Sequence, residues 1–207
     1  GAGQQVGLQE LALATPDGYT MGLTVLPTAI TVYLDPSRKA AFSAKDFIPV
    51  ALHVVDPIAV AVSNGSKYKT PKDLIDAAKA QPGSVKAGST GVMSNNHLAI
   101  IQIEKATGAQ FATVQFDGGA PSLTALMGGH IDAAFGTVGD FASQLKSGQL
   151  QVIGVMDQQR SKFFPDLKTF EEQGYKLFAV NSRAFSVPKG TSAEIVKLLE
   201  VGLQRAM

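Results

Sequence analysis

Short apolar segments rich in strand-forming residues alternate with helical segments along the whole chain, and Gly or Pro stands at most of the joins. This alternation favours an α/β fold with largely parallel strands, and strands that are apolar on both faces are typical of a buried sheet. We therefore predict an α/β protein with a largely parallel sheet. The predicted strands cover residues 19–25, 51–62, 85–88, 111–116, 131–135, 151–156, 177–180 and 184–187.

Capping signals predict where three of the helices begin. Thr70 stands before Pro71, a residue favoured at the first helical position, and the helix is predicted to end at Gln81. Residues 169–172 and 191–194 have the spacing of a capping box, in which Glu follows a hydroxyl side chain by three positions. The last of these signals predicts a helix over the final residues of the sequence.

The composition narrows the classes of partner and of chemistry. With 18 Lys and Arg against 17 Asp and Glu in 207 residues, the net charge of +1 gives no basic footprint for binding nucleic acid. The sequence contains no Cys, which excludes disulfides, thiolate metal sites and thiol nucleophiles within it. The longest apolar stretch, residues 50–62, is shorter than the roughly 20 residues of a membrane-spanning helix and is broken by polar residues.

A turn at residues 88–97 is the most informative segment. A short strand leads into Gly88-Ser89-Thr90-Gly91-Val92-Met93-Ser94-Asn95-Asn96-His97, where a helix begins. Free backbone N–H groups at a helix start lie beside the positive end of the helix dipole and form an anion-binding arrangement. The alternative is that Ser94 or Asn95 caps the helix and that the glycines only make the turn.

A second turn has the same design. The strand predicted over 111–116 runs into Asp117-Gly118-Gly119-Ala120-Pro121, with Pro121 expected at the first helical position. Two strand-to-helix turns at the same end of one sheet face a shared crevice, where ligands of α/β proteins usually bind. We therefore predict a site for a small carboxylate or a similar anion, unless Gly118 and Gly119 only relieve backbone strain.

Patterns for catalysis and metal binding are weak. Residues 88–91 lack the spacing of a nucleophile elbow, and His53, His97 and His130 lack the i, i+4 spacing of a zinc helix. We therefore expect no catalytic residue, no metal and no cofactor. Asp140 is interpreted as a helix cap, and Arg183, alone in an apolar run, requires an anionic partner, either a structural carboxylate or a ligand.

Short motifs follow one another along the chain in a distinctive order. They are Pro16-Asp17-Gly18-Tyr19-Thr20, Asp46-Phe47-Ile48-Pro49-Val50, Gly88-Ser89-Thr90-Gly91, His97-Leu98-Ala99, Gly118-Gly119-Ala120-Pro121, Gly128-Gly129-His130-Ile131-Asp132 and Thr169-Phe170-Glu171-Glu172-Gln173-Gly174. This series resembles the solute receptors of tripartite tricarboxylate transporters, also called the Bordetella uptake gene family. The resemblance covers essentially the whole chain.

The resemblance implies the α/β fold of type II periplasmic binding proteins, with two lobes around a ligand cleft. Lobe one would contain residues 1–57 and 181–207 and lobe two residues 58–180, with crossings in the extended runs 51–63 and 180–188. Members of the family carry further residues at both ends, so the resemblance also implies a chain truncated at both ends.

The same resemblance implies a function and a location. The protein would be a monomer that captures a small organic acid and delivers it to the membrane permease subunits of a tripartite transporter. Its location would be periplasmic, an expectation that rests on the resemblance because Gly1-Ala2-Gly3 opens the sequence without a visible targeting segment.

The resemblance further implies which residues contact the ligand. Backbone amides and hydroxyl groups would bind a carboxylate, while Asp117 would repel it unless that side chain points away, bridges through water or meets a ligand amine. A second acidic group would require a donor at the far end of the cleft, either Arg183 or groups from the N-terminal part that family members carry before the residues matched here. The ligand stays open among dicarboxylates, tricarboxylates, aromatic acids and acidic amino acids. The implied contacts are Ser89, Thr90, Gly91, Ser94, Asn95, His97, Asp117, Gly118, Gly119 and Ala120 in lobe two, and Thr24 and Thr28 in lobe one.

Two other functions are weighed against a transport receptor. The first is an enzyme in which Ser89 and His97 carry out acyl transfer or hydrolysis. The second is a sensor that presents its closed pair of lobes to a signalling partner.

Overall fold

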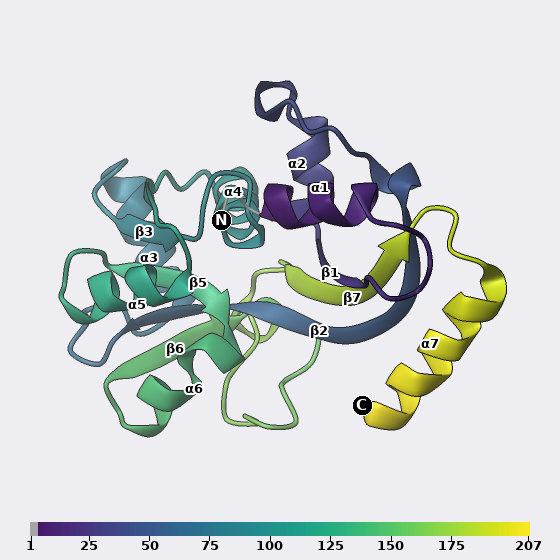
Figure 1. Cartoon of the computed structure of the whole chain (residues 1–207). Helices are drawn as coiled ribbons and strands as arrows, with labels where there is room; N and C mark the ends of the chain where they lie inside the picture. The colour runs from purple at the N-terminus through teal and green to yellow at the C-terminus, as the bar shows by residue number, and fades with distance from the viewer. Residues whose placement is uncertain (1–3) are drawn as a thin grey trace. The chain divides into compact units, whose positions relative to one another are not determined.

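Residues 4–207 are described by a computed structural model, in which the chain divides into two compact units, each with its own hydrophobic core. Unit 1 contains the described residues up to Val55 together with Asn181–Met207, and unit 2 is Asp56–Val180. The chain changes unit within β2 (Phe47–Ser63) and at the start of β7 (Val180–Pro188) (Figure 1). The opening Gly1-Ala2-Gly3 lies outside the described residues.

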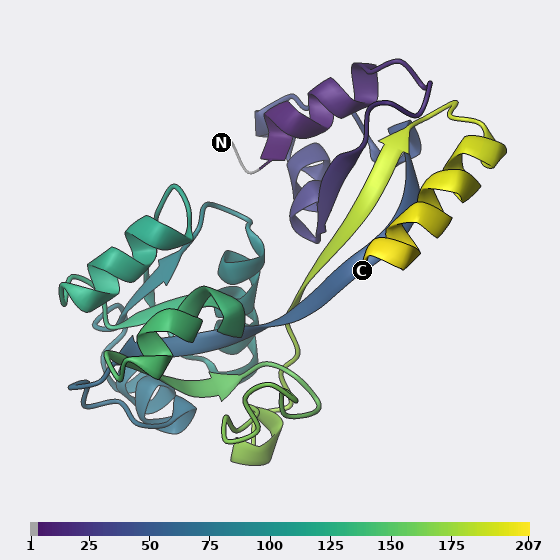
Figure 2. The same ribbon diagram turned by 60° about the horizontal axis from the view of Figure 1, so that its bottom comes forward.

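Unit 1 is built on an antiparallel pair of strands. β1 (Gly22–Leu26) pairs with β7 in a register that places Gly22 opposite Ser186. α1 (Gln5–Leu13) and α2 (Thr28–Leu34) pack against β1 and against each other (Figures 1 and 2). The core of this unit is formed by the buried side chains of Leu8, Ala29, Val32 and Phe42.

Unit 2 contains a mixed sheet in which the strands follow the order β6, β2, β5, β3, β4. β3 runs parallel to β4 and to β5, whereas β2 runs antiparallel to β5 and to β6. The predicted α/β class is confirmed, but the prediction of a largely parallel sheet is wrong, because an apolar run indicates burial and does not report strand direction. The strands of this sheet besides β2 are β3 (Lys86–Ser89), β4 (Ala112–Gln115), β5 (Ala133–Thr137) and β6 (Leu150–Val155).

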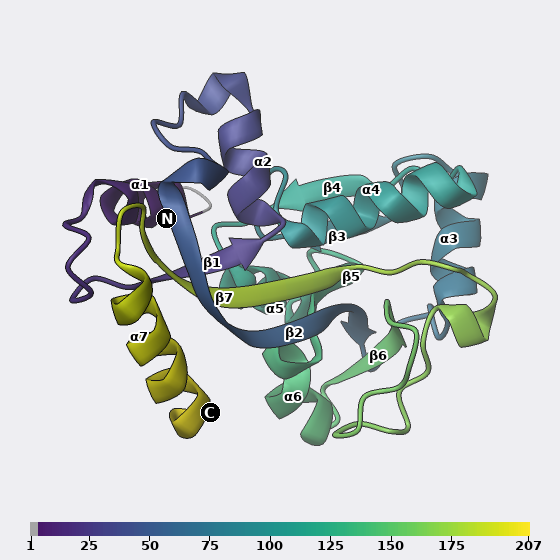
Figure 3. The ribbon, with the colours of Figure 1, turned by 90° about the vertical axis from the view of Figure 1, so that its right-hand side faces the viewer.

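Helices cover both faces of this sheet. Within residues 58–62 of β2, the even-numbered side chains join a core with α3 (Pro71–Ala80) and α4 (Asn95–Thr107). The odd-numbered side chains join a second core with α5 (Gly119–Met127) and α6 (Val138–Lys146), because successive side chains of a strand point to opposite faces. All five of these strand residues are fully buried. Figure 3 shows α4 running beside β3.

The helix start predicted at Thr70 is confirmed. Thr70 Oγ1 accepts a hydrogen bond from Asp73 N–H (3.2 Å), and Asp73 Oδ2 accepts one from Thr70 N–H (2.9 Å). The signal at Thr169 forms the same reciprocal bonds with Glu172, but there they close only the short 3-10 turn Glu171–Gln173.

The third start signal is assigned to the wrong residue. α7 (Ala193–Ala206) is capped by Ser192, whose Oγ accepts from Ile195 N–H (3.3 Å). Thr191 Oγ1 donates to Pro188 O (2.8 Å) and is therefore occupied in the turn before the helix.

The strands predicted over 177–180 and 184–187 are also corrected. The structure has one strand here, β7, and the segment before it is extended without being part of that strand. Ala179 N–H donates to Met156 O (3.1 Å), and Ile58 N–H donates to Ala179 O (2.8 Å), so Ala179 is bonded on both sides to the sheet of unit 2.

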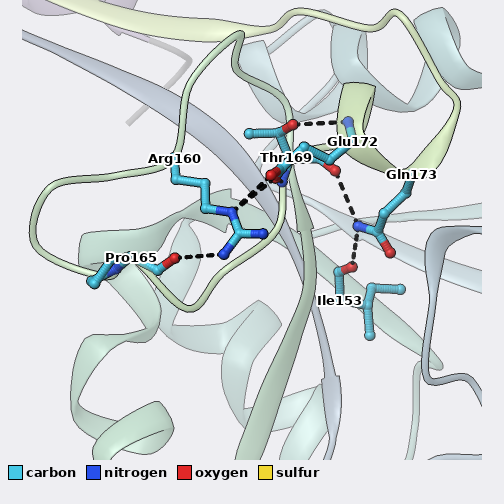
Figure 4. Close-up of polar contacts among 6 residues, drawn as sticks. All are labelled: Ile153, Arg160, Pro165, Thr169, Glu172 and Gln173. Atoms are coloured by element: carbon cyan, nitrogen blue, oxygen red, sulfur yellow. Dashed lines mark hydrogen bonds and ion pairs between the residues drawn. The ribbon is translucent and has the colours of Figure 1, made fainter.

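A polar cluster fixes the loop that follows β6. Arg160 Nε donates to both carboxylate oxygens of Glu172 (2.9 and 3.0 Å), and Arg160 Nη1 donates to Pro165 O (2.9 Å) (Figure 4). Gln173 Nε2 donates to Thr169 O (3.1 Å). The backbone hydrogen bond from Thr169 N–H, followed by the contacts with Arg160, holds the pKa of the Glu172 carboxyl below its ordinary value.

The lowered pKa of Glu172 predicts an acid-dependent contribution to stability. This contribution is present above the ordinary pKa of 4.5 and is lost as the pH falls through the lower pKa of the folded state. We expect Glu172→Gln to lower the thermal midpoint at pH 7 and to reduce its further fall between pH 5 and pH 3. Glu171→Gln, at an exposed neighbour, is the control. Equal midpoints for the two variants at every pH would contradict the assignment.

Close packing predicts a second effect on stability. A Cβ at Gly154 would lie 2.7 Å from Phe170 Cε2 and 3.0 Å from Pro71 Cγ, and the Phe170 side chain is itself buried. We expect Gly154→Ala to lower the free energy of unfolding by about 1–3 kcal/mol in urea denaturation. Gly65→Ala, where no atom lies within 4 Å of the added carbon, is expected to change it by about 0.5 kcal/mol or less. Two equal losses would show that this contact is not the cause.

Candidate functional site

The carboxyl ends of three strands lie at one edge of the sheet in unit 2. In the parallel pair of β3 and β4, Ser89 lies opposite Gln115, and Phe116 N–H donates to Ser89 O (2.8 Å). β5 is parallel to β3, with Gly88 opposite Ala134. Because each strand leads directly into a helix, the starts of α4, α5 and α6 meet at this edge. The two turns found in the sequence are neighbours, and the turn after β5 is a third.

The first turn, residues 90–94, is held by its own side chains. Ser89 Oγ lies 3.2 Å from Ser94 Oγ, and Asn96 Nδ2 donates to Thr90 Oγ1 (3.1 Å). Gly91 has a φ of 119°, a backbone conformation that favours glycine. The turn is therefore held by contacts within the protein and does not need a ligand to form.

Ser94 and His97 join this turn to α4. Ser94 Oγ accepts from His97 N–H (3.3 Å), so the capping interpretation is correct for Ser94, whereas Asn95 is the first residue of the helix. His97 Nδ1 accepts from Met93 N–H (2.9 Å), a geometry that assigns the proton of the neutral ring to Nε2. Burial lowers the pKa of His97, and the Glu104 carboxylate opposes this shift.

The second turn presents unused backbone donors. Gly118, the residue before α5, has a φ of 118° and a ψ of 174°, a region essentially confined to glycine, and no side chain caps this helix. The N–H groups of Gly119 and Ala120 donate to none of the residues that the structure describes. Pro121 is the third residue of α5, so its prediction as the first is wrong. This helix start leaves N–H groups available for an anion.

The third turn is a capping box that sequence reasoning missed. Asp140 Oδ2 accepts from Thr137 N–H (2.8 Å) and from Thr137 Oγ1 (2.9 Å), while Asp140 N–H donates to Thr137 Oγ1 (3.3 Å). Thr137 is therefore the cap of α6 and Asp140 its third residue, which corrects the prediction that Asp140 is the cap. A Thr-x-x-Asp spacing directly after a buried strand is the signal that identifies this turn.

A recess of about 320 Å³ lies beside the second and third turns, with walls from α4, α5, β5 and α6. Its apolar lining includes Phe135 and Phe141, and its polar lining includes Asn96, Ser122 and Asp140. Ser122 is 2% exposed, and its Oγ has no hydrogen-bond partner among the described residues. The recess therefore offers polar groups inside a largely apolar wall, as small-molecule sites do.

The electrostatics of this edge come from carboxylates and from neutral donors. Residues 87–98, 115–124 and 134–145 contain no Lys or Arg. Asp117 and Asp140 are both exposed, so each places a negative charge at the turns. An anion at this edge must be held by N–H and O–H groups without a cationic side chain from these segments.

Three of the predicted contact residues belong to unit 1. Thr24 is 9% exposed, and its Oγ1 donates to Ser186 Oγ (2.8 Å). Thr28 is the first residue of α2, and Arg183 is half-buried on β7, opposite Val25. The segment around Arg183 is more exposed than its apolar sequence predicts, since burial along β7 begins only at Ser186. The role of these three residues in ligand binding stays a prediction.

The geometry does not support an enzyme based on Ser89 and His97. Ser89 is fully buried, with its Oγ near Gly91 O (3.4 Å) and Ser94 Oγ, and His97 Nδ1 is occupied by Met93 N–H. A nucleophilic serine requires a hydrogen bond to its base. Within residues 4–207, no three His, Asp or Glu side chains are grouped to hold a metal, and no helix is long and apolar enough to cross a membrane.

Comparison with known proteins decides the family. The family described as the tripartite tricarboxylate transporter family receptor matches residues 1–207. The chain belongs to this receptor family. The predicted resemblance is confirmed, and because the proteins of this family are solute receptors and not enzymes, the alternative of a hydrolase is not supported.

Relatives and solved structures agree with this assignment. BugT of Bordetella pertussis is 30% identical over 211 residues, which cover 100% of this chain and 64% of BugT. A TctC solute-binding protein from Polaromonas is 29% identical with a TM-score of 0.76, over 99% of this chain and 69% of that one. MatC of Rhodopseudomonas palustris, solved with bound malate, shares the fold at 23% identity with a TM-score of 0.87, over 100% of this chain and 70% of that one. The chain spans less than two thirds of the length of BugT.

The bond between His97 and Met93 predicts a pH dependence. Because burial lowers the pKa of His97, the unfolded chain binds more protons than the folded chain once the pH falls below the ordinary value of 6.5. The stability that depends on the neutral ring is therefore present above that pH and is lost as the pH falls through the folded pKa. We expect the thermal midpoint to fall less between pH 7.5 and pH 5 in His97→Gln than in the unmodified chain.

His130→Gln is the control for this experiment, because His130 is exposed. Its midpoint is expected to change with pH as in the unmodified chain. The same pH profile for all three proteins would show that the His97 ring does not stabilise the first turn.

Proposed function

We propose that the chain is the ligand-binding part of a solute receptor that captures a small organic acid in the periplasm and delivers it to the permease of a tripartite tricarboxylate-type transporter. The observation that carries this proposal is the uncapped start of α5, where the N–H groups of Gly119 and Ala120 have no partner among the described residues. A carboxylate placed there gains charge-assisted hydrogen bonds and the favourable end of a helix dipole.

Neutral donors can supply a useful affinity. Each hydrogen bond contributes a net ~1 kcal/mol, and micromolar binding requires ~8 kcal/mol. The predicted contacts in the first turn that have exposed surface, Thr90, Gly91, Ser94, Asn95 and His97, add hydroxyl and amide groups to the two N–H groups of α5, whereas Ser89 is fully buried beneath them. Exclusion of water lowers the local dielectric constant, which strengthens these hydrogen bonds, and burial of the acid's apolar carbon atoms adds to them.

The division into lobes is part of the same proposal. Units 1 and 2 would be the two lobes, and the acid would be enclosed when they close, with Thr24, Thr28 and Arg183 as contacts from unit 1. Closure shifts the population of open and closed states, and the permease would recognise the closed state. We further propose that the receptor acts as a monomer, because a single chain supplies both units.

Binding of one class of organic acid is the direct test. A ligand that binds only the folded state raises the free energy of unfolding, by about 2.7 kcal/mol at one hundred times its Kd. We expect a rise of the thermal midpoint with one class among malate, succinate, aspartate, glutamate, citrate and benzoate, with malate included because MatC holds it. A folded chain that shows no shift with any acid would contradict the proposal.

A variant of the second turn locates the carboxylate. Gly118→Ala is expected to weaken binding at least tenfold in isothermal titration, because the cap backbone must leave its φ of 118° and displace the N–H groups of α5. Gly83→Ala is the matched control, since Gly83 also has a positive φ (75°) but lies at the opposite end of β3. If both variants bind with the affinity of the unmodified chain, the carboxylate does not lie at the start of α5.

A further inference from the structure

We propose that the ligand carries a hydrogen-bond donor, either a hydroxyl or an ammonium group, beside its carboxylate, and that Asp140 in the recess accepts a hydrogen bond from it. This inference rests on the proposed function and names the chemical class of the acid. It is carried by the polar groups that line the recess between α5 and α6.

The carboxylate site and Asp140 line the same recess. Gly119 and Ala120 form one wall of it, and Asp140 lies on another wall, contributed by α6. An acid whose carboxylate accepts from the two N–H groups can therefore extend its remaining atoms into the recess that Asp140 lines. The volume of about 320 Å³ is at the lower end of the range for small-molecule sites, which suits an acid of a few carbon atoms.

The side chains that line this recess provide hydrogen-bond acceptors. Asp140 Oδ2 is occupied by Thr137, whereas Asp140 Oδ1 has no partner among the described residues. Asn96 is 8% exposed, and because its Nδ2 donates to Thr90 Oγ1, its Oδ1 is a second acceptor that the described residues leave unbonded. These two acceptors at the recess can therefore receive hydrogen bonds from a ligand group that donates, without displacing a contact within the protein.

Ser122 is independent support for a bound polar group. Its Oγ is buried without a hydrogen-bond partner among the described residues, a situation that costs about 1–3 kcal/mol. Gly88 of β3 has no side chain to offer it, and a Cβ there would already lie 2.7 Å from this Oγ. Ser122 also lines the recess, so a ligand group in the recess can supply the partner.

Charge selects against an acid with no donor. The turns contribute the carboxylates of Asp117 and Asp140 and no Lys or Arg, so within these turns a ligand that brings only negative charge meets charged side chains of its own sign alone. A hydroxyl or ammonium group directed at Asp140 replaces part of that repulsion by a charge-assisted hydrogen bond. Recognition of the donor therefore follows from the same charges that oppose the carboxylate.

Three acids with one carbon skeleton test the inference. Succinate has no donor on its chain, malate has a hydroxyl group and aspartate has an ammonium group. In isothermal titration of the whole chain we expect malate or aspartate to bind at least tenfold more tightly than succinate, and the tighter of the two identifies the donor. Succinate binding as tightly as both would overturn the inference and leave the proposed function standing. No binding by any acid would overturn both.

Asp140→Asn tests the residue. If the new amide oxygen keeps the bond to Thr137 N–H, the amide NH₂ faces the recess and can only donate. The preference over succinate is then expected to fall at least fivefold. Asp73→Asn is the matched control, because Asp73 holds the same position in the capping box of α3, away from the recess. An unchanged preference in Asp140→Asn, or an equal loss in both variants, would overturn the assignment.

Ser122→Ala is a second variant that tests the same inference if Asp140→Asn does not fold. Removal of an unpartnered buried hydroxyl is expected to leave the thermal midpoint of the free chain unchanged or higher, while the affinity for the preferred acid falls about threefold or more. A loss of affinity without loss of stability supports a bound polar group in the recess. Unchanged affinity would show that the ligand does not reach it.

Discussion

The parallel pairing of β3 with β4 and β5 is the constraint on which the site depends. Its register places the last residues of the strands side by side, and short turns then bring three helix starts to one edge. Side chains also pack closely on β3, since a Cβ at Gly88 would lie 2.5 Å from Ile131 Cδ1. Tight packing on β3 therefore fixes the position of the anion-binding N–H groups relative to the end of the sheet.

Two of the three helix starts at this edge are capped by side chains, and the third leaves its N–H groups for a ligand. Ser94 and Thr137 cap α4 and α6, so those helices satisfy part of their own backbone and keep the turns rigid. Gly118 gives α5 no side-chain cap, so this helix start is less stable and the N–H groups of Gly119 and Ala120 are available to another molecule. An anion can thus be recognised at an edge where the carboxylates of Asp117 and Asp140 are present and Lys and Arg are not, because backbone dipoles act in place of a cation.

Local signals in the sequence were sufficient for features that depend on near neighbours. The cap at Thr70, the cap at Ser94 and the two glycine-bearing turns all depend on residues within four positions. The antiparallel course of β2 and the single strand β7 depend on partners far along the chain, which apolar periodicity does not report. The third turn was missed although its signal is local, because Asp140 was interpreted as the cap, whereas the Thr-x-x-Asp spacing makes Thr137 the cap and Asp140 the third residue of α6. The family followed from the order of the motifs, whereas the ligand contacts stay predictions.

Unit 2 is one uninterrupted stretch of chain, Asp56–Val180. It contains the hydrophobic cores on the two faces of its sheet and all three turns. Unit 1 is assembled from two separate segments. A gene fragment encoding unit 2 can therefore be excised without joining distant ends, and it would retain every backbone donor of the carboxylate site. The ratio of ligand affinities between the whole chain and this excised unit would measure how much of the binding free energy comes from enclosing the acid and how much from the turns themselves.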